Sequence, residues 1–328
     1  YGSSKAALYG VILLIIGLYM MSKVQSSLEI IISQAIFGLG SAGCGTAVVL
    51  GAVGKAVEEK NRTLSLGIVM AAGSLGQFLI VPLAGFLINL SGWTQSIIYL
   101  CFISSIMIIF CFTLTLPKKN GEDSERNNRS LKSVLDEAFA NKSYNLLTLG
   151  FFVCGFHVSF VATHLPAYLE DISLPIWIGS WSLALIGLFN VFGTLMFGKM
   201  GDSKSKKNLL AILYSLRAVL FLIFIFLPKN EITILIFAAL LGILWLSTVP
   251  LTSGIISVIF GSRYMSMLYG FTFLSHQIGS FLGSWFGGRL YDYYGSYDIM
   301  WWICVALGFV SAAMHMPIIE KPLSKKYS

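Results

Sequence analysis

Apolar residues are grouped along the chain in blocks of about 20, and short polar or charged stretches separate the blocks. This is the length of α-helix that crosses a hydrocarbon core of roughly 30 Å. Within a block such as Val11–Met21 the residues are apolar on every side, which favours helices over the alternating strands of a membrane barrel. The pattern predicts ten membrane-spanning helices: 6–23, 28–53, 64–90, 93–116, 143–169, 175–198, 208–227, 232–258, 264–290 and 297–317.

Composition supports an all-α polytopic membrane protein. Apolar residues make up 56% of the chain and charged residues 11%, whereas about a quarter of the residues in a soluble domain are charged. All five cysteines lie inside the predicted helices without metal-ligand spacing, so we predict neither disulfides nor a zinc site. We expect no bound metal and no cofactor.

The basic residues predict the orientation in the membrane. Of the 22 Lys and Arg residues, only Lys23, Lys229 and Arg289 lie at one end of the predicted helices, Arg217 lies within a helix, and the rest lie at the other end. Short cytoplasmic loops collect Lys and Arg, so the basic end is predicted to be cytoplasmic. The net charge of +7 is explained by these loops and by anionic lipid, without nucleic acid as a partner.

An internal repeat organises the chain. When the sequence is shifted by 203 residues without a gap, five glycines fall on five glycines, and Phe78-Leu79 falls on Phe281-Leu282. The same shift places the first four predicted helices on the last four, running in the same direction. The matched glycines are Gly51 with Gly254, Gly67 with Gly270, Gly76 with Gly279, Gly85 with Gly288 and Gly92 with Gly295.

The repeat predicts two parallel halves. Residues 1–116 form the last four helices of the first half, and residues 143–317 form a complete second half of six. The polar stretch 117–142 is predicted to be a flexible cytoplasmic linker, and 318–328 a cytoplasmic tail. Because residue 1 maps onto residue 204, we expect two further helices, about 60 residues, before Tyr1 and twelve helices in all, six in each half.

One loop carries a motif of a known family. The run from Gly198 to Lys207 reads Gly-Lys-Met-Gly-Asp-Ser-Lys-Ser-Lys-Lys. It resembles the cytoplasmic loop motif of the major facilitator superfamily and keeps Gly198, Asp202, Lys206 and Lys207, but has serine at 203 and 205. The resemblance implies the major facilitator fold, and a cytoplasmic gate in which the Asp holds the two halves together. A lysine-rich loop that only sets orientation is the alternative.

Two further runs narrow the resemblance. Gly155-Phe-His157 through Leu165-Pro166, and Ser275-His276-Gln277 through Gly288, are similar to bacterial relatives of the monocarboxylate and oxalate:formate transporters. This resemblance implies a multi-pass protein of the bacterial inner membrane. It also implies a small carboxylate as substrate.

Arg217 is the clearest candidate for binding substrate. It is centred in the predicted helix 208–227, where an ionisable side chain is costly, and its repeat counterpart is the apolar Leu14. A guanidinium offers a fixed charge and a fork of donors that suits a carboxylate, so it points to an anionic substrate. The alternative is a structural bond to a buried carbonyl or acid.

The remaining polar residues at depth are histidines and amides. His157 and His276 can change protonation near neutral pH and are candidates for coupling protons to transport, with His164 nearer the outer end as a rim or gate group. Each could instead be a hydrogen-bonded packing residue. Asn190, Gln77 and Gln277 are predicted either to bind substrate or to hydrogen-bond across helices.

The sequence favours transport driven by a gradient and disfavours an enzyme. It contains no Walker loop, His-Glu-x-x-His pair or Gly-x-Ser-x-Gly elbow. We expect a secondary carrier, functional as a monomer, that moves a small organic anion with protons by alternating access. A drug- or sugar-type efflux carrier is the alternative, favoured if Arg217 faces another helix instead of a central cavity. A lipid enzyme or a channel is less supported, because the acids and polar residues are scattered.

Overall fold

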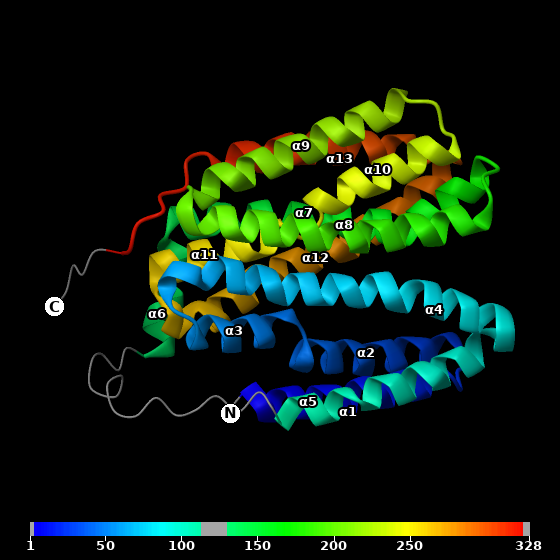
Figure 1. Ribbon diagram of the computed structural model, residues 1–328, viewed down its shortest axis with the longest axis horizontal. Coiled ribbons are helices and arrows are strands. Elements are labelled where there is room, and N and C mark those ends of the chain that lie inside the picture. The colour runs from blue at the N-terminus through cyan, green and yellow to red at the C-terminus, as the bar shows by residue number, and fades with distance from the viewer. Residues whose placement is uncertain (1–2, 113–129, 324–328) are drawn as a thin grey trace. The chain divides into compact units, whose positions relative to one another are not determined.

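The computed structural model describes residues 3–112 and 130–323, and every regular element in these ranges is a helix (Figure 1). The described residues form two compact units, 3–56 with 80–112 and 57–79 with 130–323. These units differ from the predicted halves, because residues 57–79 pack with the later part of the chain. The division into halves at 1–116 and 143–317 therefore stays a prediction.

The first unit is built on close contact between two helices. It contains α1 (Ser3–Met21), α2 (Ser27–Cys44), α3 (Thr46–Ala56), the second part of α4 (Arg62–Ser105) and α5 (Met107–Cys111). A Cβ atom on Gly10 of α1 would lie 2.8 Å from the carbonyl oxygen of Gly40, and one on Gly43 would lie 2.9 Å from the Cα of Gly10. Glycine at these positions lets the two backbones touch, as is common in membrane helices.

The second unit contains the start of α4 and all later helices. After the short 3₁₀ turn η1 (Glu59–Asn61) and the first part of α4, its elements are α6 (Leu131–Ala140), α7 (Lys142–Asp171), α8 (Ile176–Ser203), α9 (Lys206–Phe226), α10 (Glu231–Leu244), α11 (Thr248–Phe260), α12 (Ser262–Tyr294) and α13 (Asp298–His315).

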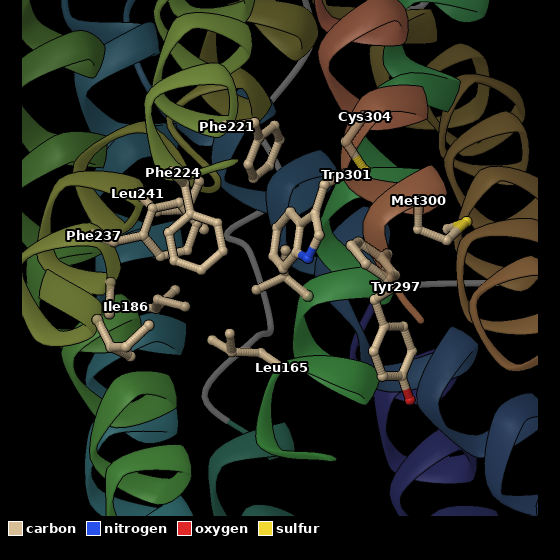
Figure 2. Close-up of a cluster of buried hydrophobic side chains, with 14 of the residues drawn as sticks. Leu165, Ile186, Phe221, Phe224, Phe237, Leu241, Tyr297, Met300, Trp301 and Cys304 are labelled. Atoms are coloured by element: carbon tan, nitrogen blue, oxygen red, sulfur yellow. The ribbon is translucent and has the colours of Figure 1, made fainter. Parts of the chain in front are cut away.

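An aromatic cluster forms part of the core of the second unit. Figure 2 shows Trp301 of α13 beside Phe221 and Phe224 of α9 and Phe237 of α10. The ring centroid of Trp301 lies 4.8 Å from that of Phe224, 5.8 Å from that of Phe221 and 6.1 Å from that of Phe237. Such tilted aromatic pairs add to the burial energy, so this cluster fixes α9, α10 and α13 together.

Glycines also join α7 to α12. A Cβ on Gly279 would meet the backbone of Phe152 and Phe156, and one on Gly283 would meet the Phe156 backbone. From the other side, a Cβ on Gly155 would meet the carbonyl of His276. The two helices can pack this closely only because these positions have no side chain.

The local geometry agrees with the predicted repeat. Gly92, inside α4, and Gly295, which ends α12, are paired by the 203-residue shift, and both have positive φ, 77° and 66°. The predicted helix 28–53 is broken between α2 and α3 at Gly45, and its counterpart 232–258 is broken between α10 and α11. Both copies therefore interrupt the same helix, at positions that differ by one to three residues under the shift.

The ten predicted helices are all present as helical segments, and the corrections concern breaks within them. Helices 28–53 and 232–258 are each divided into two, and 93–116 is interrupted between α4 and α5. The predicted separation of 64–90 from 93–116 is confirmed, because Gly92, with φ 77° and ψ 167°, ends one helix and begins the next inside the stretch labelled α4. Residues 113–116 lie outside the described part of the chain. Eight described stretches are long and apolar enough to cross a membrane; one, Arg62–Cys111, covers two predicted helices, and α12 is not among them.

The predicted flexible linker is also corrected in part. Residues 117–129 lie outside the described residues, but 131–140 form the helix α6. Ser130 caps its first turn by accepting the Ser133 N–H, and Val134 and Ala138 are buried on one face. The ring of Phe139 packs on Tyr144 of α7, with 6.0 Å between centroids. This end of the linker is thus an amphipathic helix of the second unit that packs on α7.

Candidate functional site

The break between α10 and α11 lies inside a candidate membrane span, Glu231–Phe260. Pro250, the third residue of α11, has no N–H with which to bond the carbonyl of Leu246 four residues earlier, and this favours the interruption. Around Trp245 the helical ladder stops, so peptide groups are left without intrahelical partners. In hydrocarbon such groups must find other partners.

Arg217 supplies partners for the end of α10. Its Nη2 donates to the carbonyl oxygens of Leu244 and Trp245, the latter at 2.6 Å. Its Nη1 lies 3.7 Å from Sγ of Cys154 on α7, and its Nε has no hydrogen-bond partner in the described part of the chain. The side chain is fully buried, and among the described residues no carboxylate forms an ion pair with it.

Side chains from α7 and α8 bind the other groups at the break. Oδ1 of Asn190 accepts the N–H of Leu246 at 2.9 Å, while its Nδ2 donates to Oγ of Ser74 at 2.6 Å. The hydroxyl of Thr248, the first residue of α11, lies 3.3 Å from Sγ of Cys154. Both ends of the Asn190 amide are therefore committed to helix contacts.

Two predicted histidines lie buried in this unit with unpaired ring nitrogens. His157 is fully buried, neither of its nitrogens has a partner among the described residues, and its ring meets the Phe221 ring edge-on at 5.1 Å. Nδ1 of His276 lies 3.1 Å from Oε1 of Gln277, while its Nε2 is unpartnered within the same residues. Gln277 is otherwise exposed on α12.

His164, near the C-terminal end of α7, has a contact at each of its ring nitrogens. Its Nε2 lies 2.8 Å from the carbonyl of Ser284, and because a carbonyl only accepts, Nε2 carries the hydrogen. Nδ1 is then the acceptor for the Tyr297 hydroxyl at 3.3 Å. His164 thus joins α7, α12 and the start of α13, and its role as a rim or gate group stays a prediction.

The sequence analysis missed His315 and Tyr214. Nδ1 of His315 donates to the carbonyl of Ser311 at 2.7 Å, and its ring stacks on Tyr214 at 5.0 Å. The guanidinium of Arg217 lies 5.4 Å from the centre of the same Tyr214 ring. His315 was overlooked because it ends an apolar helix. The spacing of Tyr214 three residues before Arg217 places both on one helix face and could have revealed the pair.

Two sets of contacts join α4 to α8 inside the second unit, one made by Gln77 of α4 and one by the loop motif at the end of α8. Nε2 of Gln77 donates to the carbonyl of Leu183 at 3.1 Å. Oδ1 and Oδ2 of Asp202 accept the N–H groups of Thr63 and Leu64 at 2.9 and 3.0 Å. These amides belong to the first turn of α4, where an anion is favoured. A Cβ on Gly198 would lie 3.1 Å from the Thr63 carbonyl, so glycine lets the helices approach.

The two lysines of the motif, Lys206 and Lys207, differ from Asp202, which binds the first turn of α4. They bind the segment that follows α13. Their N–H groups donate to the carboxylate of Glu320, which also accepts the Ser205 hydroxyl at 3.0 Å. Nζ of Lys207 donates to the Met316 carbonyl at 3.0 Å. Glu320 therefore caps the start of α9, and the first residues of the predicted tail are held against the helices.

Comparison with known proteins identifies relatives. A model of the Major Facilitator Superfamily matches residues 1–284. The chain is 23% identical over 277 residues to an uncharacterized MFS-type transporter, YcxA, of Bacillus subtilis, covering 82% of this chain and 67% of that protein. It is 22% identical over 331 residues to monocarboxylate transporter 12 of Mus musculus, covering 89% of this chain and 68% of that protein.

Solved structures show the same fold. The Escherichia coli fucose:proton symporter FucP matches with a TM-score of 0.70 at 14% identity, covering 95% of this chain and 84% of that one. The proton:xylose symporter XylE matches with a TM-score of 0.71 at 14% identity, covering 94% and 78%. At this identity the likeness concerns the arrangement of helices alone.

Proposed function

The chain belongs to the Major Facilitator Superfamily, and from that membership we propose that it carries a small organic anion such as a monocarboxylate, together with protons. Membership makes it a multi-pass membrane protein, a secondary transporter and not an enzyme, with the all-α fold that was predicted. The proposal also includes the substrate and the coupling ion. It further includes location in the bacterial inner membrane, with the basic loops in the cytoplasm, and function as a monomer.

The buried charge of Arg217 carries the proposal for an anion. Taking a guanidinium out of water costs several kcal/mol, and two carbonyl dipoles offset this only in part. The described residues give it no acidic partner. A substrate carboxylate would supply the missing negative charge and could form two parallel hydrogen bonds with it. The similarity to a protein named monocarboxylate transporter 12 supports the same substrate class.

Histidines are the candidates for the proton. His157 and the Nε2 of His276 are buried without partners in the described residues, so each can accept a bond or a proton when the surrounding helices move. Asp202, through its bonds to the first turn of α4, is our candidate for the cytoplasmic gate, with Gly198 beside it. Gln77 and Gln277 stay candidates for substrate contact, whereas Lys206 and Lys207 support the gate through Glu320.

A sugar- or drug-type carrier is the second candidate. The guanidinium of Arg217 contacts α10 and α7, and contact with other helices is the condition under which we expected this alternative to gain support. The same contacts would then be purely structural. Uptake of carboxylates compared with uptake of a sugar separates the two.

Uptake into proteoliposomes tests the proposal. With an inward proton gradient, we expect accumulation of labelled L-lactate or pyruvate, and little uptake of D-xylose. Arg217→Ala should lower the carboxylate uptake by a factor of about 10 or more, because a charged hydrogen-bond pair is worth roughly 1.5–3 kcal/mol. Leu210→Ala is the matched control, since it shortens another fully buried side chain of α9 and removes no charge. Uptake of sugar but not of carboxylate would overturn the anion proposal. Carboxylate uptake that does not respond to the proton gradient would overturn proton coupling.

A further inference from the structure

The guanidinium of Arg217 cannot bind a carboxylate at two points while it holds the end of α10. A guanidinium has two edges that present paired hydrogens to a carboxylate, Nε with Nη2 and Nη1 with Nη2. Both edges use Nη2. In this protein Nη2 has two hydrogens and two carbonyl partners, Leu244 and Trp245, so neither edge is free.

We propose that the substrate anion displaces these carbonyls from Arg217 and thereby straightens the break between α10 and α11. This inference rests on the proposed function, because it assigns the anion to the same Arg217. It adds that substrate binding and straightening of the helix are one event, because the substrate and the two carbonyls compete for Nη2 of Arg217.

The displaced carbonyls have new partners within their own helix. In a continuous helix the oxygen of Leu244 would accept the N–H of Thr248, and that of Trp245 the N–H of Val249. Thr248 is the first residue of α11 and so has no acceptor inside α11. The N–H of Val249 now bonds the Leu246 carbonyl three residues back, at 3.0 Å. On straightening it would bond the Trp245 carbonyl, four residues back, instead. Straightening therefore pairs both carbonyls once Arg217 leaves them.

Pro250 makes the change reversible. If Val249 moves to Trp245, the Leu246 carbonyl loses its partner, and Pro250 has no N–H to replace it. One unpaired carbonyl in the straight form favours return to the broken form when the anion departs. Asn190 holds the Leu246 N–H in the broken form and does not touch Arg217, so it steadies the break independently of the substrate.

The far end of α11 connects the break to the candidate gate. Nη1 of Arg62 donates a hydrogen bond to Oγ of Ser257 at 3.0 Å, and the N–H of Leu323 donates one to the Ile259 carbonyl at 3.1 Å. A Cβ on Gly254 would lie 3.0 Å from Lys206 and 3.3 Å from the hydroxyl of Thr63, whose N–H binds Asp202. A change in the direction of α11 is thus passed to residues that hold Asp202.

Hydrogen exchange at the break tests the inference, with the protein in lipid nanodiscs and mass spectrometry of peptides covering 244–252. With saturating L-lactate, the amide of Thr248 should exchange about tenfold more slowly, since it enters a helical bond. The amide of Val249 should slow by less, because it replaces its bond to the Leu246 carbonyl with one to the Trp245 carbonyl. D-xylose should have no effect. In Arg217→Ala these amides should already exchange slowly without lactate, because the carbonyls are released, and lactate should change nothing.

Asn190→Ala is the matched variant. It removes a different side chain from the same break, so exchange at Leu246 should quicken while the response of Thr248 and Val249 to lactate remains. It also shows whether a damaged break still gives a folded protein, as judged by size-exclusion chromatography of each variant.

Two results would overturn the inference. If calorimetry shows that lactate binds but exchange at Thr248 and Val249 is unchanged, Arg217 and the break do not compete, although the proposed function stands. If Arg217→Ala folds and leaves the exchange of these amides as in the unsubstituted protein, Arg217 does not hold the break. Failure of every carboxylate to bind would instead remove the proposed function, and the Arg217→Ala comparison without ligand would still decide whether Arg217 holds the break.

Discussion

Replacing Gly279 with valine is expected to prevent the second unit from folding, whereas the same replacement of Gly270 is expected to be tolerated. At Gly279 a Cβ would meet the carbonyl of Phe152 and lie 3.1 Å from the N atom of Phe156, so α7 and α12 would have to separate. At Gly270 no atom of the described residues outside the adjoining turns of α12 lies within 4 Å of the added Cβ. Overpacking against side chains costs about 1–3 kcal/mol, and here the obstacle is backbone, which cannot rotate away.

The pair of variants isolates packing from helix propensity. Both glycines lie in α12, and both replacements introduce the same β-branched residue. Fluorescence-detected size-exclusion chromatography should give a single folded peak for Gly270→Val and aggregated or absent protein for Gly279→Val. Equal behaviour of the two would contradict the close α7–α12 packing.

Replacing Asp202 with alanine is expected to open the candidate gate and reduce transport. The change removes two acceptors from the first turn of α4, each worth roughly 1.5–3 kcal/mol when the acceptor is charged. A loss of about 3 kcal/mol would favour the open form by a factor of about 100. Asp202→Asn keeps one acceptor and should lie between the two.

Alkylation of a cysteine at position 63 measures the opening. Thr63 is buried, and its contact with Asp202 is made by its backbone N–H, so Thr63→Cys preserves the bond. The alkylation rate from the side of the basic loops should rise from the Asp202 background to Asp202→Asn and then to Asp202→Ala. An equal rate in all three would show that Asp202 is only part of a basic loop that sets orientation.

The hydrophobic pattern predicted the helices well, because spanning hydrocarbon imposes both length and composition. It missed the breaks because Gly45 and Trp245–Ser247 lie inside long apolar runs, although Pro250 was a usable signal. It missed α6 because the charges of Lys132, Asp136 and Glu137 concealed the helical spacing of Val134 and Ala138. An amphipathic surface helix cannot be found by searching for apolar blocks.

The residues of the candidate site were chosen from the sequence, and their role in transport stays a prediction, whereas their contacts could not be predicted. The depth of Arg217 and its absence from the other repeat copy identified it as unusual, and the structure shows its side chain fully buried. Its partners are backbone carbonyls exposed by a helix break, and a sequence does not show which carbonyls are free. In the same way, the Asn190 amide could be placed at depth but not paired with Leu246, which depends on how α8 packs on α10.

The most direct test of the central claim, transport of a small organic anion, is counterflow. Proteoliposomes loaded with unlabelled L-lactate are diluted into labelled L-lactate at equal pH on both sides, which measures exchange of substrate without any proton gradient. The proposal predicts transient accumulation of label that is strongly reduced by Arg217→Ala and absent for D-xylose loaded and offered in the same way. Counterflow of xylose, with none of L-lactate or pyruvate, would contradict it.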